Sequence, residues 1–274
     1  MIFLDILTPV FESGSVLETC IKSVIDQGSE VRHLIQDGAS KDAATREILR
    51  FIDTDVVSEA DTGMYDALNR ALARSSGDVV GHLNADEQYL PEVLSRVRGI
   101  FEAKPDVDVV CGDMVLSDSA WNPLSYRRSV LPPAGSAGVI PLPVPTCGMF
   151  FRRRLFDAGL SYRADLRAIG DAVLVQQLIQ MKVVWYFDPI PYAVFSIHDK
   201  NLSNSGAAER DRNTANLQSS LPRALRCRIQ TWIRKWARGA YQKRDINIMI
   251  YPSGGKGARV LRSGKNLGWN WPKH

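Results

Sequence analysis

Short apolar segments alternate with helical patterns through the first hundred residues, and this alternation allows few architectures. Five apolar segments predict strands, at residues 3–10, 31–36, 56–59, 79–83 and 107–111. Apolar residues at helical spacing predict helices between them, at residues 16–25, 43–52, 64–74 and 91–103. Repeated strand and helix units of this kind form a parallel sheet covered by helices on both faces. We therefore expect an α/β fold with a Rossmann-like, mostly parallel central sheet.

The chain changes character after residue 115. Residues 116–145 contain six prolines and two glycines, which predict loops and extended pieces that link two halves. Regular patterns then return, with strands expected at residues 146–153 and 183–187 and a helix at residues 172–181.

Polar residues follow the predicted strands of the first half. Open parallel sheets bind ligands beyond the carboxyl ends of their strands, so these side chains are expected at one edge. They are Thr8, Asp37, Glu59, Asp61, Asn84, Asp86 and Glu87.

Composition excludes several classes of protein. With 45% hydrophobic and 23% charged residues, the chain can bury a sizeable core. No segment approaches the roughly 20 apolar residues of a membrane span, and the apolar start lacks a basic leader. The four cysteines form no CxxC pair, which argues against a zinc cluster or a disulfide framework and favours a reducing cytoplasm; they are Cys20, Cys111, Cys147 and Cys227.

The net charge of +4 is unevenly distributed. Residues 1–221 contain 21 Lys and Arg against 29 Asp and Glu, a net charge of −8. Residues 222–244 contain eight basic residues and no acidic one. An acidic body does not suit a nucleic-acid surface, which needs clustered Lys and Arg. The basic segment needs an explanation of its own.

Familiar nucleotide motifs are absent, and a set of carboxylates remains. No G-x-G-x-x-G fingerprint, P-loop or G-x-S-x-G elbow is present. Asp86 follows an apolar strand directly, with Asn84 and Glu87 beside it. A Mg²⁺ or Mn²⁺ ion is typically bound by one or two carboxylates, and a substrate phosphate supplies further oxygen ligands. The alternative is that these acids only begin the helix at Pro91, where they complement its dipole.

Five short motifs, in this order, give the chain a family resemblance. The sequence resembles the family 2 glycosyltransferases, over about residues 1–205 and most strongly in the first 90. The motifs are residues 8–11 (TPVF), 36–42 (QDGASKD), 58–69 (SEADTGMYDALN), 76–78 (SGD) and 83–87 (LNADE). The resemblance implies a GT-A fold and an inverting enzyme. Such enzymes transfer a sugar from a nucleotide diphosphate, commonly a UDP-sugar, to a hydroxyl acceptor with help from Mn²⁺ or Mg²⁺.

The resemblance assigns several donor-binding residues. Thr8 and Pro9 match the end of the family's first strand, beside the nucleotide. Asp37 matches the acid that pairs with the base, although an Asp-Gly turn explains the same residue. Asp61 matches the acid of the family's E-x-D-x-G stretch. Asn84 replaces the first acid of the family's D-x-D metal motif, which lowers the local charge.

The resemblance also implies metal ligands. Asp86 matches the last acid of the D-x-D motif. His198 and Lys200 lie where related enzymes bring a late loop over the diphosphate, so that His198 would ligate the metal and Lys200 would neutralise phosphate. An ordinary surface His and Lys remain the alternative.

Inversion needs a general base opposite the leaving diphosphate, and the resemblance makes Asp171 the candidate. Asp also favours a helix N-cap position, which is the competing explanation. At a helix N-terminus its pKa should be depressed unless burial compensates. The pair Thr146 and Cys147 stands where relatives often show His-Gln, so the acceptor contact at these positions departs from the family pattern.

The basic segment predicts an amphipathic helix. Between residues 222 and 244, apolar residues including Trp232 and Trp236 recur at helical spacing among Arg and Lys. Such a helix suits an anionic membrane surface, and the alternative is packing on the acidic body. Residues 245–274 are rich in glycine and are expected to be loops.

Together these observations predict an organisation and a function. A GT-A domain is expected over residues 1–221, with a nucleotide-sugar half to about residue 115 and an acceptor half after it, followed by the basic extension at residues 222–274. The expected enzyme acts on a saccharide or lipid-linked saccharide, in the synthesis of a cell-surface polysaccharide, on the cytoplasmic face of the membrane. A catalytically silent nucleotide-sugar binder and a nucleotidyl transferase are the alternatives.

Overall fold

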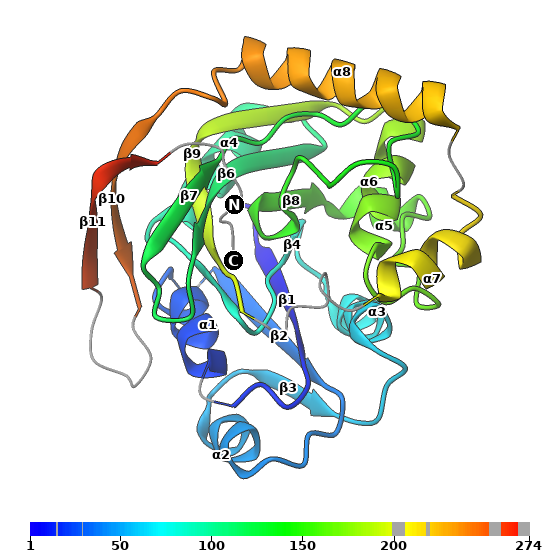
Figure 1. Cartoon of the computed structure of the whole chain (residues 1–274). Helices are drawn as coiled ribbons and strands as arrows, with labels where there is room; N and C mark the ends of the chain where they lie inside the picture. Colours follow the sequence, from blue (N-terminus) through cyan, green and yellow to red (C-terminus); the bar gives the residue numbers. More distant parts are fainter. Residues whose placement is uncertain (15, 29, 199–205, 218–219, 252–258, 268–274) are drawn as a thin grey trace.

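The computed structural model describes residues 1–14, 16–28, 30–198, 206–217, 220–251 and 259–267. Its central sheet begins with four parallel strands, in the order β3 (Asp55–Ser58), β2 (Val31–Asp37), β1 (Leu4–Val10) and β4 (Val79–His82). Their carboxyl ends therefore meet at one edge, as the sequence predicts (Figure 1).

Helices connect these parallel strands close to where the sequence predicts them. They are α1 (Val16–Ile25), α2 (Ala43–Phe51) and α3 (Met64–Arg74). Asp42 caps α2, because its carboxylate accepts a hydrogen bond from the backbone N–H of Thr45 at 2.8 Å. The apolar positions of α1 and α3 face the sheet, and this burial holds the helices in place.

The second half of the sheet is mixed rather than parallel. After β4 come β8 (Met149–Arg152), β6 (Val109–Ser117), β9 (Trp185–Ser196) and β5 (Glu87–Tyr89), while β7 (Pro123–Arg127) pairs with β6. β8 runs antiparallel to both neighbours, and β9 runs parallel to β6. Sequence patterns missed β5 and β7, and they placed residues 146–148 in a strand where the chain forms a 3-10 turn (Thr146–Gly148).

The remaining helices of the body are α4 (Val93–Ala103), α5 (Arg153–Asp157), α6 (Gly170–Gln180) and α7 (Ala207–Thr214). The helix predicted from Pro91 therefore begins two residues later. α6 was predicted to begin at Ala172, and it begins two residues earlier at Gly170, which lies directly against the ring of Tyr65.

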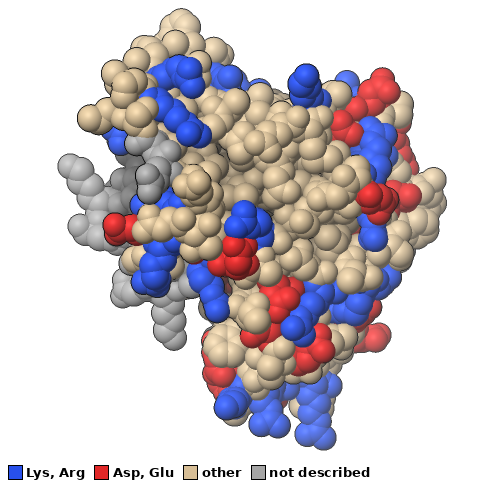
Figure 2. Space-filling view, turned by 90° about the vertical axis from the view of Figure 1, so that its right-hand side faces the viewer, with Lys and Arg blue, Asp and Glu red and all other residues tan. Residues whose placement is uncertain are grey.

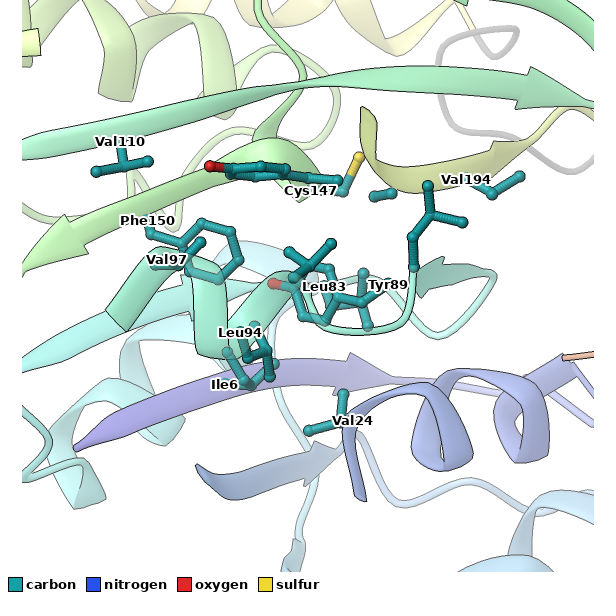
Figure 3. Packing of buried hydrophobic residues seen from close by; sticks show 14 of the residues in the cluster. Ile6, Val24, Leu83, Tyr89, Leu94, Val97, Val110, Cys147, Phe150 and Val194 are labelled. Atoms are coloured by element: carbon teal, nitrogen blue, oxygen red, sulfur yellow. The ribbon is translucent and has the colours of Figure 1, made fainter. Parts of the chain in front are cut away.

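Two apolar clusters form most of the core, one on each face of the sheet. The first joins α1 and α4 to the sheet, and Figure 3 shows Leu83, Tyr89 and Phe150 in its interior. The rings of Tyr89 and Phe150 lie 5.4 Å apart. The second cluster joins α3, α5 and α6 to the opposite face. Both clusters hold the strand ends in a fixed arrangement, which positions the site.

The C-terminal extension departs from the loop-rich segment that the sequence predicts. After α8 (Leu221–Ala237), residues form the antiparallel pair β10 (Arg244–Ile250) and β11 (Arg259–Leu267). Ile248 and Ile250 join the first core cluster. The side-chain amide of buried Gln88 donates to the backbone oxygen of Tyr251 and accepts from the backbone N–H of Tyr251. Buried contacts of this kind make the extension part of the folded body. Across the described ranges, no helix has the length and apolar content that crossing a bilayer takes.

Candidate functional site

Asp37 ends β2 at the carboxyl edge, and its carboxylate is buried. It accepts hydrogen bonds from the Ser40 hydroxyl at 2.5 Å, the Ser40 backbone N–H at 3.1 Å and the Ser58 hydroxyl at 2.6 Å. These bonds fix the turn after β2 and tie it to the end of β3. The turn explanation for Asp37 thus has direct support, while its contact with a nucleotide base stays a prediction.

Asp61 lies against this turn. A Cβ atom on Gly38 would come within 2.8 Å of Asp61 Oδ2, so a larger residue there would displace the Asp61 carboxylate. The other oxygen, Oδ1, accepts the backbone N–H of Gly63 at 2.8 Å. Burial raises the pKa of Asp61, and the nearby Asp66 and Asp37 act in the same direction.

Thr8 and Pro9 occupy the end of β1 differently. The Thr8 side chain is fully buried, and its hydroxyl lies 2.8 Å from Nε2 of buried His33. Pro9 is only partly buried and stands beside Gln36 in the sheet register. A ligand at this edge would therefore meet the backbone of Thr8 and the ring of Pro9.

The structure brings Asp86 and His198 together although 112 residues separate them. His198 Nε2 lies 2.8 Å from Asp86 Oδ2, and about a quarter of each side chain is exposed. One imidazole nitrogen and one carboxylate, both accessible, are ligands that Mn²⁺ accepts. Within the described residues, no three His, Cys, Asp or Glu side chains gather closely enough to hold a metal alone. The pair fits a metal whose other ligands come from the substrate and water.

Asn84 and Glu87 shape the turn that presents Asp86. Asn84 Oδ1 lies 2.9 Å from His82 Nε2, and its backbone N–H donates to Glu87 Oε2 at 2.7 Å. Glu87 is buried, so its carboxyl group points inward instead of supplying oxygen at the edge. Burial, together with neighbouring Asp86, raises the pKa of Glu87 to about 8.

Asp171 occupies the first turn of α6, where it is partly buried. Ile169 is the N-cap residue, so the N-cap explanation for Asp171 is wrong. Its carboxylate accepts the backbone N–H of Ala172 at 2.7 Å, and its own backbone N–H donates to the Tyr65 hydroxyl at 3.1 Å. Burial outweighs these hydrogen bonds and raises the pKa of Asp171 to about 6. Burial thus more than compensates for the depressed pKa expected at a helix N-terminus.

A row of aromatic contacts connects Asp171 with the turn at Asn84. The ring of Tyr65, which bonds the Asp171 backbone, stacks on Tyr162 with centroids 6.3 Å apart. Tyr162 in turn meets His82 edge to face at 5.8 Å, and His82 bonds Asn84. The two predicted parts of the site are therefore joined by direct packing.

Two residues that sequence patterns missed organise the segment before Asp171. One oxygen of buried Asp211, on α7, accepts the backbone N–H groups of Arg167, Ala168 and Ile169 at 2.6 to 3.1 Å. The Arg167 side chain then lies across Gly63, whose φ of 132° and missing Cβ make room for it. No local motif marks Asp211, because its partners are 42 to 44 residues away.

Lys200 lies outside the described residues. A cavity of about 600 Å³ opens elsewhere, at the amino ends of the parallel strands, where its lining includes Asp5, Arg32 and Asp55. Asp5 there binds the backbone N–H groups of Ser76 and Gly77, and Arg32 pairs with Asp55. These groups satisfy one another, and the cavity lies on the opposite edge from the predicted site residues.

The fold matches solved structures over most of this chain. Staphylococcus aureus TarS, solved in complex with UDP-GlcNAc, matches with a TM-score of 0.58 and 14% identity, over 74% of this chain and 61% of that one. A mannosyltransferase from Pyrobaculum calidifontis, solved with GDP-Man and Mn²⁺, matches with a TM-score of 0.58 and 15% identity, over 86% and 72%. The predicted GT-A fold is confirmed.

The family follows from the sequence comparison. The family model described as Glycosyl transferase family 2 matches residues 5–160, more than half of the chain. Proteins named "PGL/p-HBAD biosynthesis glycosyltransferase" from Mycobacterium bovis and Mycobacterium tuberculosis are 24% identical over 183 residues. That match covers 61% of this chain and 66% of theirs, just under two thirds of their length. The chain belongs to glycosyl transferase family 2.

Proposed function

We propose that this enzyme transfers a sugar from a nucleotide diphosphate, with inversion, to an acceptor hydroxyl, and that Asp171 is the general base. The observation that carries the proposal is the raised pKa of Asp171, about 6, on a helix that packs against the donor-side motif through Tyr65. At neutral pH this carboxylate is ionised, yet it is a stronger base than an ordinary Asp.

Each step has a group to perform it. The Asp171 carboxylate accepts the proton of the acceptor hydroxyl while the hydroxyl oxygen bonds to the anomeric carbon. The bond from that carbon to the donor diphosphate breaks on the opposite face, which inverts the configuration. Tyr65 and Asp211 hold the segment of Asp171 in position through backbone N–H groups, so orientation contributes to the rate alongside basicity.

A divalent cation, Mn²⁺ or Mg²⁺, would be held by Asp86 and His198. When bound, it would neutralise charge on the leaving diphosphate. The accessible pair at 2.8 Å supports this assignment, as does the Mn²⁺ of the Pyrobaculum enzyme. Asn84 stands where the family has a first carboxylate, so the protein offers one acidic ligand fewer. The donor would therefore supply most of the cation's other ligands.

The donor would lie along the carboxyl edge of the parallel strands. In this proposal a uridine base lies near Asp37, with Thr8 and Pro9 beside the nucleoside, and Asp61 and Asn84 line the sugar and diphosphate pocket. Lys200 would pair with phosphate. Solved relatives hold either a UDP or a GDP sugar, and UDP is preferred here because a carboxylate at Asp37 can accept the N3 hydrogen of uracil.

The acceptor would be a saccharide, free or lipid-linked, used in cell-surface polysaccharide synthesis on the inner face of the cell membrane. The names of the curated relatives, which refer to PGL/p-HBAD biosynthesis, and the basic α8 support this setting. A silent nucleotide-sugar binder is the second candidate, because Cys147 is buried and interacts with Glu87 instead of offering a polar group to an acceptor.

Product analysis separates these functions. Purified enzyme is incubated with UDP-sugars or GDP-mannose, Mn²⁺ and a panel of saccharide acceptors. We expect release of the nucleoside diphosphate and a product with inverted anomeric configuration by NMR. In a parallel incubation with UTP or GTP and a sugar 1-phosphate, release of pyrophosphate would indicate nucleotidyl transfer. A donor that raises the melting temperature but is never consumed would establish the silent binder.

A further inference from the structure

Helix α8 packs on the body with its polar face, which is the reverse of an ordinary surface helix. Its buried residues are Cys227 and Thr231. Beside them, Arg223 donates to the backbone oxygen of Gly135 at 2.8 Å, and Arg234 donates to that of Leu131 at 2.7 Å. At the end of the helix, Arg128 donates to the backbone oxygen of Arg238 at 3.1 Å. These contacts fix how the helix is turned.

The apolar face of α8 therefore points to solvent. The exposed apolar side chains occupy one arc of the helix, opposite Cys227 and Thr231, and they repeat every three or four residues. They are Leu221 (88% exposed), Leu225 (60%), Ile229 (49%), Trp232 (58%), Ile233 (51%) and Trp236 (70%). A continuous ridge of six large apolar side chains exceeds the scattered exposure of an ordinary surface and marks a contact surface.

Positive charge borders this ridge. Arg226 lies on one side of the apolar arc and Arg228 on the other, and both are exposed. Residues 222–244 include no acidic residue. Figure 2 shows the top of the molecule, where α8 lies in Figure 1, as mostly uncharged atoms with Lys and Arg where it meets the body. A second copy of the ridge would bring these arginines together without an acid to neutralise them.

We propose that the outward face of α8 is a membrane-contact surface that lies in the interface of an anionic bilayer. The six apolar side chains enter the boundary between headgroups and acyl chains, and the two tryptophans suit this depth. Arg226 and Arg228 meet anionic headgroups at its edges. This proposal assigns a particular surface, the outward face of α8, to the membrane location proposed above. It rests on the proposed function only where it takes the acceptor to be lipid-linked.

The same helix is coupled to the predicted base. Gly135, held by Arg223, donates its backbone N–H to Gln176 Oε1 on α6 at 2.6 Å. Figure 1 places α8 across the end of the body that includes α6. A membrane under α8 would therefore keep the Asp171 helix at a fixed distance from the lipid surface, as a lipid-linked acceptor requires.

Vesicle flotation with the full chain tests the surface. Vesicles contain either phosphatidylcholine alone or equal parts of phosphatidylcholine and phosphatidylglycerol. We expect binding to the anionic vesicles, and the double variant Trp232→Ser with Trp236→Ser should weaken it by at least tenfold. The matched control is Phe51→Ser, which removes an aromatic ring that is 75% exposed on α2, and it should bind like the wild type.

A second variant pair tests the charges and guards against misfolding. Arg226→Glu with Arg228→Glu keeps the ridge but should abolish the preference for phosphatidylglycerol. Wild-type protein that ignores anionic vesicles, or tryptophan variants that bind unchanged, would overturn the proposal. So would a wild-type dimer in sedimentation that the tryptophan variants convert to monomer. The assay contains no donor, so a failure of the proposed transfer reaction does not affect it.

Discussion

The two halves of the sheet build their parts of the site in different ways. In the parallel half, polar side chains follow their own strands, and the turn next to the strand holds them, as Ser40 holds Asp37. In the mixed half, Asp171 and His198 reach the site through partners far away in the chain. Under the proposed function, donor binding would depend mainly on the turns that follow the parallel strands, whereas transfer would depend on long-range packing that orients a single helix.

The largest expected effect tests this division directly. Asp171→Asn should lower transfer by about 10³-fold, within the range of a lost general base, and leave donor affinity unchanged. Because burial raises the pKa of Asp171, its ionised form costs the folded state free energy at neutral pH. The variant should therefore be more stable at pH 7 by about 3 kcal/mol. Single-turnover kinetics, donor calorimetry and thermal unfolding measure the three quantities. Loss of donor binding would instead give Asp171 a role in the donor half.

Removing the Asp86 carboxylate should affect the donor half alone. Asp86→Ala should weaken Mn²⁺-dependent binding of UDP by about 100-fold, because it deletes one of the two protein ligands. His198 would then remain as a lone ligand. Calorimetric titration of Mn²⁺ into enzyme with UDP measures the change without any turnover. Asp106→Ala, which removes an exposed acid outside the site, is the control, and an unchanged Mn²⁺ titration of Asp86→Ala would refute the assignment.

Sequence patterns predicted the parallel half well, because each strand and helix there has its own periodicity. They failed for β5, which has three residues, and for β10 and β11, because the glycines of residues 245–274 suggested loops. In the site, the positions of Asp86 and Asp171 followed from family motifs. Tertiary contacts determine three other features, which no local sequence pattern predicts. They are the burial of the Glu87 carboxyl group, the packing of α8 by its polar face, and the hydrogen bonds from Arg167, Ala168 and Ile169 to Asp211.

The pH dependence sharpens the comparison. Asp171 must be ionised to accept a proton, so the rate should fall as the pH drops through about 6. Between pH 7 and pH 5 the fall should be about tenfold, whereas an Asp with an ordinary pKa would lose little. The rate under saturating donor, with donor affinity measured at each pH, isolates the step. A flat rate down to pH 5 would contradict the assigned pKa or the assigned base.

The smallest expected effect comes from Asp211, which touches no substrate and acts by positioning. Asp211→Ala leaves the N–H groups of Arg167, Ala168 and Ile169 without their common acceptor, at a cost of about 2 kcal/mol in stability. Without these hydrogen bonds, the segment before α6 should orient Asp171 less well. We expect kcat to fall by about tenfold and the KM for the donor to stay unchanged. Glu209→Ala, which removes an exposed acid from the same helix, is the matched control. If Asp211→Ala lowers stability but leaves kcat unchanged, the segment before α6 does not orient Asp171. The proposal that long-range packing positions the base would then be wrong for Asp211.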